Sequence, residues 1–364
     1  MLPVFVHPSD LRDFANGLRE RRAAHKPSFV KIDAIQGSAP ALVDGFGRRI
    51  SYLRVSVTDR CDFRCRYCMA EAMTFLPRHA LLTLEELALI VDRFVDRGIT
   101  KVRLTGGEPL VRRGLPELAA RIGRRIGDGL DELTLTTNGA RLIEAAEPLA
   151  AAGIRRINVS LDTLDRTRFA FIARRDAFDE VMAGIAAAKA AGLAIKINMV
   201  ALKGLNDGEF VAMAEWCGAQ GFDLSIIETM PLGNVDEDRT DRFYPLTAVR
   251  EQLASRFSLT PTERSTGGPS RYVFAEEAGI HIGFISPLTH NFCAACNRVR
   301  LTAEGKLYLC LGQNDHVDLK ASLRSGGPDA LDAALDEAMR IKPKAHDFRI
   351  ETPAVARHMS VTGG

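Results

Sequence analysis

Three cysteines, Cys61, Cys65 and Cys68, lie within a span of eight residues with the spacing C-x3-C-x2-C. They follow an apolar β-type run, 50–57, so we expect them on the loop that leaves a strand. Clustered thiolates are ligands for soft metal centres, and a four-iron cluster normally takes four cysteines. With three, one iron keeps an open position for another ligand. The alternatives are a structural zinc site, for which this spacing is unusual, and a group of buried thiols.

A second group of three cysteines, Cys293, Cys296 and Cys310, has the spacing C-x2-C-x13-C. It also lacks a fourth sulfur, and it therefore fits a second iron–sulfur cluster with an open iron. The alternative is a zinc site of three cysteines and one histidine. The histidines that could complete such a site are His281, His290 and His316.

Basic residues alternate along several predicted strands. Arg298 and Arg300 point to the same side of a strand, and two guanidinium groups on one face suit a polyphosphate. Further basic residues near strand ends are Arg54, Lys101, Arg103 and Lys196. We expect this set to converge at one end of the fold and to bind an anionic substrate. The alternative is a solvent-exposed basic face of the strand.

The composition narrows the class of protein. The chain has 364 residues, of which 46% are hydrophobic, enough for a sizeable core in one large or two ordinary domains. The net charge is +2 and no basic block alternates with aromatic residues, so we expect no nucleic-acid partner. We expect no membrane contact either, because no apolar run approaches membrane-spanning length. The odd total of seven cysteines favours metal sites in a reducing, cytoplasmic compartment, with Cys217 left over as a buried helix thiol.

A regular alternation of strands and helices begins at Ile50. It predicts parallel βα units, because each β-type run is followed by a helical pattern. Strands are expected at 50–57, 100–105, 131–137, 154–160, 193–200 and 222–228, and helices at 83–97, 114–126, 140–152, 177–191 and 207–220. The predicted fold class is α/β, an incomplete (βα)6 barrel of the TIM type. Its site should lie at the C-terminal ends of the strands.

The pattern divides the chain into three parts. Residues 1–48 are expected to be an N-terminal extension with a helix ending near residue 22, residues 49–230 the barrel, and residues 231–364 a smaller α+β domain. The last part carries the second cysteine group and ends in Gly363-Gly364. Its strands are expected at 271–275, 280–285, 298–302 and 306–309, and its helices at 318–324 and 328–340.

Several motifs together resemble those of radical S-adenosylmethionine (SAM) enzymes. Tyr67 precedes the last cysteine of the first group, and the sequence TGGEP, 105–109, ends the second strand. Taken alone, TGGEP fits a loop turn and Met230 fits core packing. The resemblance implies that Cys61, Cys65 and Cys68 hold a [4Fe-4S] cluster whose open iron chelates SAM. The residues that it implies for SAM binding are Tyr67, Gly107, Ser160 and Met230.

The stretch SPLTHNFCAACNRVRLTAEGKLYLCLG, 286–312, together with the terminal Gly-Gly, resembles the GTP 3′,8-cyclases of molybdenum cofactor biosynthesis. The resemblance covers the chain from about residue 49. It implies a second [4Fe-4S] cluster on Cys293, Cys296 and Cys310, whose open iron meets the guanine of GTP. It also implies GTP contacts from Arg54, Arg103, Thr136, Lys196, Arg298, Val299 and Arg300.

The implied reaction begins with hydrogen abstraction from C3′ of GTP by the 5′-deoxyadenosyl radical, and the substrate radical then adds to C8. The product is (8S)-3′,8-cyclo-7,8-dihydroguanosine 5′-triphosphate, which cyclic pyranopterin monophosphate synthase consumes next. The resemblance also implies a homodimer, an electron donor, and a tail whose Gly363 and Gly364 act in the active site. One departure is Ser225, where the family usually has an arginine, so that one triphosphate contact is absent or comes from elsewhere.

Two other functions are compatible with part of this pattern. A radical SAM enzyme of peptide maturation with an auxiliary cluster domain would share both cysteine groups, but the arginine pair and the Gly-Gly end disfavour it. A non-catalytic iron–sulfur electron carrier would need sites with four cysteines, and neither group has four.

Overall fold

The computed structural model describes residues 40–236, 239–351 and 354–363. The chain divides into two units, Met1–Ser38 and Ala39–Gly364, and all the described residues belong to the second. The predicted helix ending near residue 22 lies outside the described residues. In the described part of the chain, no helix is long and apolar enough to cross a membrane.

Six parallel strands form the centre of the second unit, and each matches a strand expected from the sequence. They are β1 (Tyr52–Ser56), β2 (Lys101–Thr105), β3 (Glu132–Thr137), β4 (Arg156–Ser160), β5 (Ala194–Ala201) and β6 (Asp223–Glu228). The five expected helices are also present: α2 (Leu84–Asp96), α3 (Leu115–Gly123), α4 (Leu142–Ala151), α6 (Phe178–Ala190) and α7 (Phe210–Gln220). One further helix, α5 (Arg166–Ala173), was not predicted, because its sequence RTRFAFIA has no clear amphipathic stripe.

Two strands from the C-terminal region extend this parallel sheet. Strand β9 (Ile280–Ile285) pairs in parallel with β6, and β10 (Arg298–Leu301) pairs in parallel with β1. Antiparallel strands continue the sheet beyond both: β8 (Arg271–Ala275) and β7 (Leu259–Pro261) on one side, β11 (Lys306–Tyr308) and β12 (His316–Asp318) on the other. The incomplete barrel is therefore confirmed, and β9 and β10 flank its six βα strands so that eight strands run in parallel. The domain boundary at residue 230 stays a prediction.

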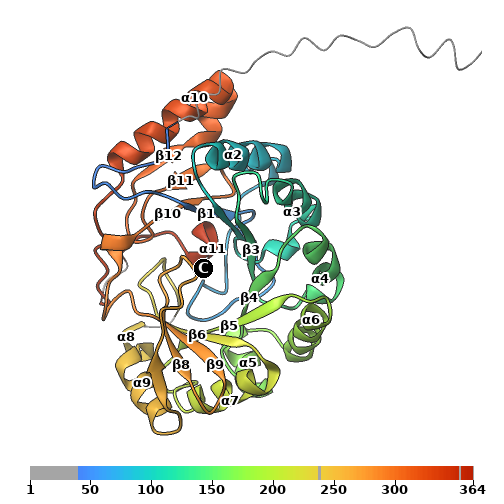
Figure 1. Ribbon diagram of the computed structural model, residues 1–364, viewed down its shortest axis with the longest axis vertical. Coiled ribbons are helices and arrows are strands. Elements are labelled where there is room, and N and C mark those ends of the chain that lie inside the picture. Colours follow the sequence, from blue (N-terminus) through green and yellow to red (C-terminus); the bar gives the residue numbers. More distant parts are fainter. Residues whose placement is uncertain (1–39, 237–238, 352–353, 364) are drawn as a thin grey trace, which may run out of the picture. The chain divides into compact units, whose positions relative to one another are not determined.

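The residues of the parallel strands alternate between an apolar outer face and a polar inner face. In β1, Leu53 and Val55 are fully buried, and α2, α3, α4 and α6 lie along the outer side of the strands (Figure 1). Tyr52 and Arg54, between them, line a pocket inside the barrel. The same alternation places Arg103 and Lys196 inside. The outer face thus forms the hydrophobic core, and the interior is left for polar side chains.

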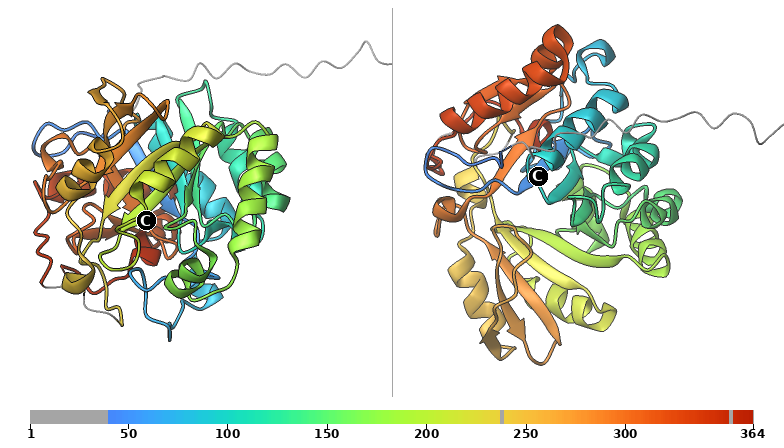
Figure 2. Two further views of the ribbon diagram at one scale, coloured as in Figure 1. Left: turned by 90° about the horizontal axis from the view of Figure 1, so that it is seen from below. Right: turned by 45° about the horizontal axis from the view of Figure 1, so that its top comes forward.

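The remaining helices cover the barrel edge and its interior. They are α8 (Arg239–Arg242), α9 (Leu246–Ala254), α10 (Leu319–Ile341) and α11 (Met359–Thr362). A kink at Gly327, with φ 66°, divides α10 into the two helices that were predicted. Figure 2 shows α10 alongside α2, where Arg93 and Arg97 form ion pairs with Asp332 and Asp336. The short α11 packs against β1 inside the curve of the strands (Figure 1).

Candidate active site

The first cysteine group lies on the loop after β1, as expected, and the unpredicted helix α5 holds this loop. The backbone amides of Arg64 and Arg66 donate to the carbonyl oxygens of Ala173 and Ile172, each at 3.0 Å. Cys68 N donates to Cys65 O at 2.9 Å, which closes a turn between the two cysteines. The loop therefore has a fixed backbone that turns Cys61, Cys65 and Cys68 toward one region.

The cysteines of this group are half-buried, and their thiols lie close enough to affect one another electrostatically. Burial, together with the charges of neighbouring thiols and acids, raises the pKa of Cys61 and Cys68 to about 12 and the pKa of Cys65 well above its usual value. Thiolates here are costly without a cation to balance them. A cationic iron–sulfur core would supply that balance, so the donor set fits the cluster implied by the sequence.

The TGGEP glycines pack directly on the backbone of the cysteine loop. A Cβ atom on Gly106, whose φ is +148°, would lie 2.3 Å from Thr58 O, and one on Gly107 would lie 2.4 Å from Arg60 O. Gly107 N donates to Thr58 O at 2.9 Å. Only glycine allows β2 to end this close to the loop. The next residue, Glu108, is fully buried and accepts from Thr137 Oγ1 at 2.8 Å.

The residues implied for SAM binding are distributed around the first cysteine group. Tyr67 and Ser160 line one small pocket together with Cys65. Tyr67 donates its hydroxyl to Asp162 Oδ2 at 2.8 Å, and burial raises the pKa of Asp162 to about 6. Met230 lines the larger pocket inside the barrel. Asp162 was not among the predicted site residues, although it follows Ser160 by two positions.

The second cysteine group lines the large pocket from the opposite side. Cys293 begins a 3-10 turn, Cys293–Ala295, and Cys310 follows β11. The three proposed histidine ligands lie elsewhere: His281 is beside Asp223, His316 meets Asn314 O at 2.8 Å, and His290 is exposed. His346, which the sequence did not single out, lines the pocket with the cysteines.

The described residues form no compact site for a single metal ion. Within residues 40–236, 239–351 and 354–363, no three or more Cys, His, Asp or Glu side chains converge closely enough to hold one ion. An iron–sulfur cube binds each thiolate to a different iron, so its ligands stand further apart. Burial raises the pKa of Cys296, but Lys342, Arg298 and Arg300 outweigh it and hold that pKa below the usual value. Burial raises the pKa of Cys310 in spite of Lys342 and Arg300, so these cations bring a thiol pKa below its usual value at Cys296 but not at Cys310.

The large pocket is strongly cationic. No Asp or Glu appears among its described lining residues, which include Arg54, Arg103, Lys196, Arg298 and Arg300, with Thr136 and Val299 beside them. Arg300 Nε and Nη1 and Arg298 Nε are buried without a hydrogen-bond partner. Burial and mutual repulsion lower the pKa of Arg54 to about 10 and that of Arg300 to about 9. Such a site favours an anionic ligand.

Two of these cations, Arg103 and Lys196, donate hydrogen bonds to tyrosine and threonine hydroxyl groups and not to carboxylates. Arg103 Nε donates to Tyr52 Oη at 2.5 Å and its Nη1 to Thr136 Oγ1 at 2.9 Å. Lys196 Nζ donates to Tyr272 Oη at 3.0 Å. Burial opposes ionisation of Tyr52, but Arg103, Arg54 and Lys101 lower its pKa to about 7, so this phenol both orients Arg103 and is partly ionised near neutral pH. Tyr52 lies two residues before Arg54, so the strand alternation itself could have identified it.

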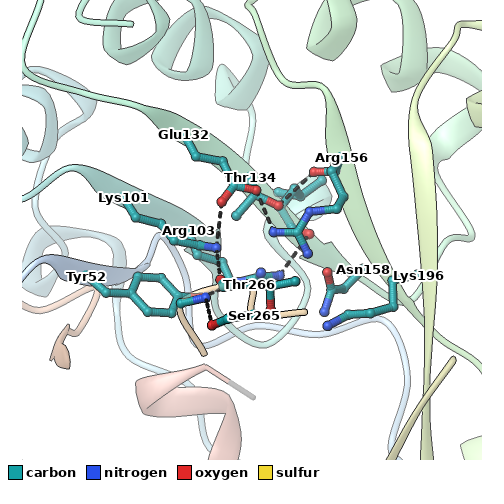
Figure 3. A network of polar contacts seen from close by, with 12 residues as sticks. Tyr52, Lys101, Arg103, Glu132, Thr134, Arg156, Asn158, Lys196, Ser265 and Thr266 are labelled. Atoms are coloured by element: carbon teal, nitrogen blue, oxygen red, sulfur yellow. Dashed lines mark hydrogen bonds and ion pairs between the residues drawn. The ribbon is translucent and has the colours of Figure 1, made fainter. Parts of the chain in front are cut away.

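Lys101, which the sequence grouped with the pocket cations, lies outside the pocket lining. Its Nζ forms an ion pair with Glu132 at 2.5 Å, and Glu132 also pairs with Arg156 at 2.5 Å. Figure 3 shows these three residues linked in a row beside Arg103, Asn158 and Lys196. Lys101, Glu132 and Arg156 are the first residues of β2, β3 and β4, respectively. In this network two basic side chains share one carboxylate at the N-terminal ends of their strands.

Ser225 is fully buried and its Oγ has no partner. A Cβ atom on the neighbouring Gly283 would lie 2.8 Å from the Tyr272 ring and 3.0 Å from Ser225 Oγ. The Tyr272 ring therefore packs beside these two small residues, and its hydroxyl meets Lys196. In this chain, the pair formed by Tyr272 and Lys196 therefore lies next to Ser225, the position at which the family usually has an arginine.

The C-terminal segment connects the two cysteine groups. Arg357 Nη2 donates to Cys310 O at 3.0 Å, and the amide of Ser360 donates to the thiol of Cys68. Gly363 lines the large pocket, and a Cβ atom on it would lie 2.2 Å from Thr105 Cγ2 at the end of β2. Gly364 lies outside the described residues. The segment thus reaches the interior of the barrel between the groups.

Comparison with known proteins agrees with these features. Residues 55–217 match the model of the radical SAM superfamily, and residues 222–348 match the model Molybdenum Cofactor Synthesis C. The chain is 62% identical to the GTP 3′,8-cyclase of Erythrobacter litoralis over 90% of its own length and 100% of the relative's. The chain belongs to the GTP 3′,8-cyclase family. It is also 57% identical to the GTP 3′,8-cyclase of Rhizobium etli strain CIAT 652, covering 91% of this chain and 96% of that protein.

Solved structures support the fold. Streptococcus suis SuiB bound to S-adenosylmethionine has a TM-score of 0.55 at 15% identity, covering 99% of this chain and 84% of that one. Another structure of Streptococcus suis SuiB has a TM-score of 0.56 at 14% identity, covering 92% of this chain and 73% of that one. Similarity at this level shows the fold alone. The sequence relatives favour the cyclase over the peptide-maturation alternative.

Proposed function

We propose that this chain is a radical SAM GTP 3′,8-cyclase that binds SAM and GTP inside the barrel between its two cysteine groups. The observation that carries the proposal is the large pocket, which is lined at once by the second cysteine group and by five basic residues, without any described acid. A nucleoside triphosphate offers an anionic chain for the cations and a base for an open iron. The family of the chain supports the same substrate.

The basic residues are proposed to bind the triphosphate. Arg298 and Arg300 leave β10 toward the pocket with buried nitrogens that lack partners, and a buried donor gains most from an anionic acceptor. Arg103 and Lys196 approach from β2 and β5, already oriented by phenols. Arg54, Thr136 and Val299 complete the proposed contacts.

Tyr67, Gly107, Ser160 and Met230 are proposed to bind SAM next to Cys61, Cys65 and Cys68. When bound, the two [4Fe-4S] clusters and SAM supply an electron, the radical that abstracts hydrogen from C3′ of GTP, and a coordination site for guanine. The residues of the chain fix the distance between SAM and GTP and exclude water from the barrel. Gly363 and Gly364 are proposed to act beside the substrate, because Gly363 lines the pocket.

The product is expected to be (8S)-3′,8-cyclo-7,8-dihydroguanosine 5′-triphosphate. We also propose a homodimer, an electron donor that reduces the clusters, a cyclic pyranopterin monophosphate synthase that consumes the product, and a cytoplasmic location.

The test is anaerobic incubation of the cluster-reconstituted chain with SAM, a strong reductant and GTP, followed by chromatography and mass spectrometry. We expect 5′-deoxyadenosine and a cyclised nucleotide with the mass of GTP, formed in step. A matched incubation with ATP controls for recognition of the base. Cleavage of SAM without any change in GTP would contradict the proposal.

A further inference from the structure

The backbone of the second cysteine group is held by three basic side chains from distant parts of the chain. They are Arg48, before β1; Lys342, just after α10; and Arg357, before α11. Each donates hydrogen bonds to carbonyl oxygens in or beside the cysteine-bearing segments. We call these three residues the basic cradle.

Each member of the basic cradle holds a different part of the site. Arg48 Nη1 donates to Cys293 O at 2.8 Å. Lys342 Nζ donates to Arg298 O at 3.3 Å and also to Leu309 O, the residue before Cys310. Arg357 Nη2 donates to Cys310 O at 3.0 Å and to Leu311 O at 2.6 Å. The cysteines lie on two segments, the turn that carries Cys293 and Cys296 and the segment after β11 that carries Cys310. The pairing of β10 with β11 joins these segments, and the three cations hold their backbones in addition.

Lys342 is the member whose charge bears most directly on the site. Its side chain is 3% exposed, and no carboxylate in the described ranges forms an ion pair with it. Burial lowers the pKa of Lys342 and Arg48 adds to this effect, while the thiols of Cys296 and Cys310 and the carboxylate of Asp44 oppose it. The same carbonyl that Lys342 binds, Arg298 O, accepts from Cys296 Sγ at 3.9 Å. An ammonium group buried in this way favours negative charge on the neighbouring sulfurs.

The other two members carry less unbalanced charge toward the site. Arg48 is paired with Asp44, at 2.6 Å between Nε and Oδ2. Arg357 stacks on the Tyr308 ring, with its guanidinium carbon 4.1 Å from the ring centre, and is partly exposed. Their main effect is therefore on the position of the backbone, whereas Lys342 affects both position and charge.

We propose that the basic cradle positions the second cysteine group for a cluster, and that Lys342 within it raises the reduction potential of that cluster. Reduction adds one negative charge to a thiolate-bound cluster, and a buried cation nearby stabilises the more negative state. Net charge and hydrogen bonding are among the factors that set iron–sulfur potentials. The inference rests on the proposed function only in requiring a cluster at Cys293, Cys296 and Cys310.

The experiment compares three variants of the full-length chain after anaerobic reconstitution. Lys342→Met removes the charge and keeps the length of the side chain, and Lys342→Arg restores the charge. Lys320→Met is the matched control, because Lys320, in α10, likewise donates to a backbone carbonyl, Ala80 O, but lies away from both cysteine groups. Iron content and redox titration followed by electron paramagnetic resonance report on each cluster without turnover.

We expect Lys342→Met to shift the reduction equilibrium of the second cluster at least tenfold toward the oxidised form, which is about 59 mV for one electron. The first cluster and the Lys320→Met control should keep their potentials. Unchanged potential of the second cluster in Lys342→Met, or an equal change in both clusters, would overturn the proposal.

If Lys342→Met fails to retain iron at the second site, Lys342→Arg decides. Recovery of that iron in Lys342→Arg supports a role for the charge, whereas equal loss in both variants overturns it. Wild-type chain that holds both clusters but does not cyclise GTP would refute the proposed function alone, because the basic cradle is tested by iron content and potential.

Discussion

The two cysteine groups have the same number of sulfurs but opposite electrostatic surroundings. The first is near acids: Glu108 and Asp62 affect Cys61, and Asp162 affects Cys65 and Cys68. The second is near Lys342, Arg298 and Arg300. SAM carries a sulfonium cation and GTP carries a triphosphate. Because both groups offer three cysteines, the charges around them, and not the cysteines themselves, distinguish the ligand that each open iron is proposed to bind.

The largest expected effect comes from removing a sulfur, and it should differ between the groups. Serine at Cys61, Cys65 or Cys68 should abolish SAM cleavage, because the cluster that donates the electron is lost. Serine at Cys293, Cys296 or Cys310 should leave some SAM cleavage and stop GTP conversion. Chromatography of 5′-deoxyadenosine and of nucleotide products measures both. Wild-type cyclisation by the second set of variants would refute the separation of roles.

Removal of a pocket cation should weaken GTP binding without affecting SAM. Arg298→Ala or Arg300→Ala is expected to cost about 1.5–3 kcal/mol of binding free energy, the scale of a hydrogen bond to a charged group. Isothermal titration of the reconstituted chain measures the affinity for GTP and for SAM. Arg324→Ala, which removes an exposed arginine paired with Glu86, is the matched control. Equal losses of affinity for GTP and for SAM would contradict the proposed difference between the two sites.

Gly107→Ala should disturb the first group alone. The added Cβ would lie 2.4 Å from Arg60 O, and overpacking of this kind costs about 1–3 kcal/mol of unfolding free energy. Gly268→Ala is the control, because its Cβ would meet its nearest atom, Thr266 Oγ1, at 3.8 Å. Thermal unfolding and iron content measure the effect. Loss of iron from the second group but not the first would be inconsistent with the packing described.

The smallest effect is expected in the pH dependence of the cluster-free chain. Burial raises the pKa of Glu108 from 4.5 to about 7. The folded chain therefore binds more protons than the unfolded chain, so this contribution to stability is complete below about pH 4.5 and is lost as the pH rises through about 7. Thermal unfolding across this range should show a shallower fall in Glu108→Gln than in the wild type. Parallel curves would argue against this contribution.

Local patterns in the sequence predicted all strands except the three-residue β7 and β12, and all helices except α5, α8, α9 and α11, because these patterns depend on periodicity or spacing over a few residues. The pairing of β1 with β10 was not predicted, since it joins Arg54 to Arg300 across most of the chain. Helix α5 was missed because it is short and lacks an amphipathic stripe.

Contacts between distant residues were the least predictable part of the site. Arg48 binds Cys293 O across 245 positions, and no local signal marks such a pair. His346 likewise reaches the pocket, and Tyr272 reaches the pocket residue Lys196, only through the fold. Lys101 was assigned to the pocket from its alternation with Arg103, but its ion pair with Glu132 keeps it outside the lining.

The polar interior of the barrel has a consequence for the stability of the whole chain. Five basic side chains line the pocket without a described acid, so their mutual repulsion opposes folding until an anion arrives. A triphosphate bound there would balance the positive charges in the interior of the barrel. Its binding raises the free energy of unfolding by about 2.7 kcal/mol when the free ligand is at a hundred times its Kd. The melting temperature of this protein is therefore expected to rise with the concentration of free nucleotide.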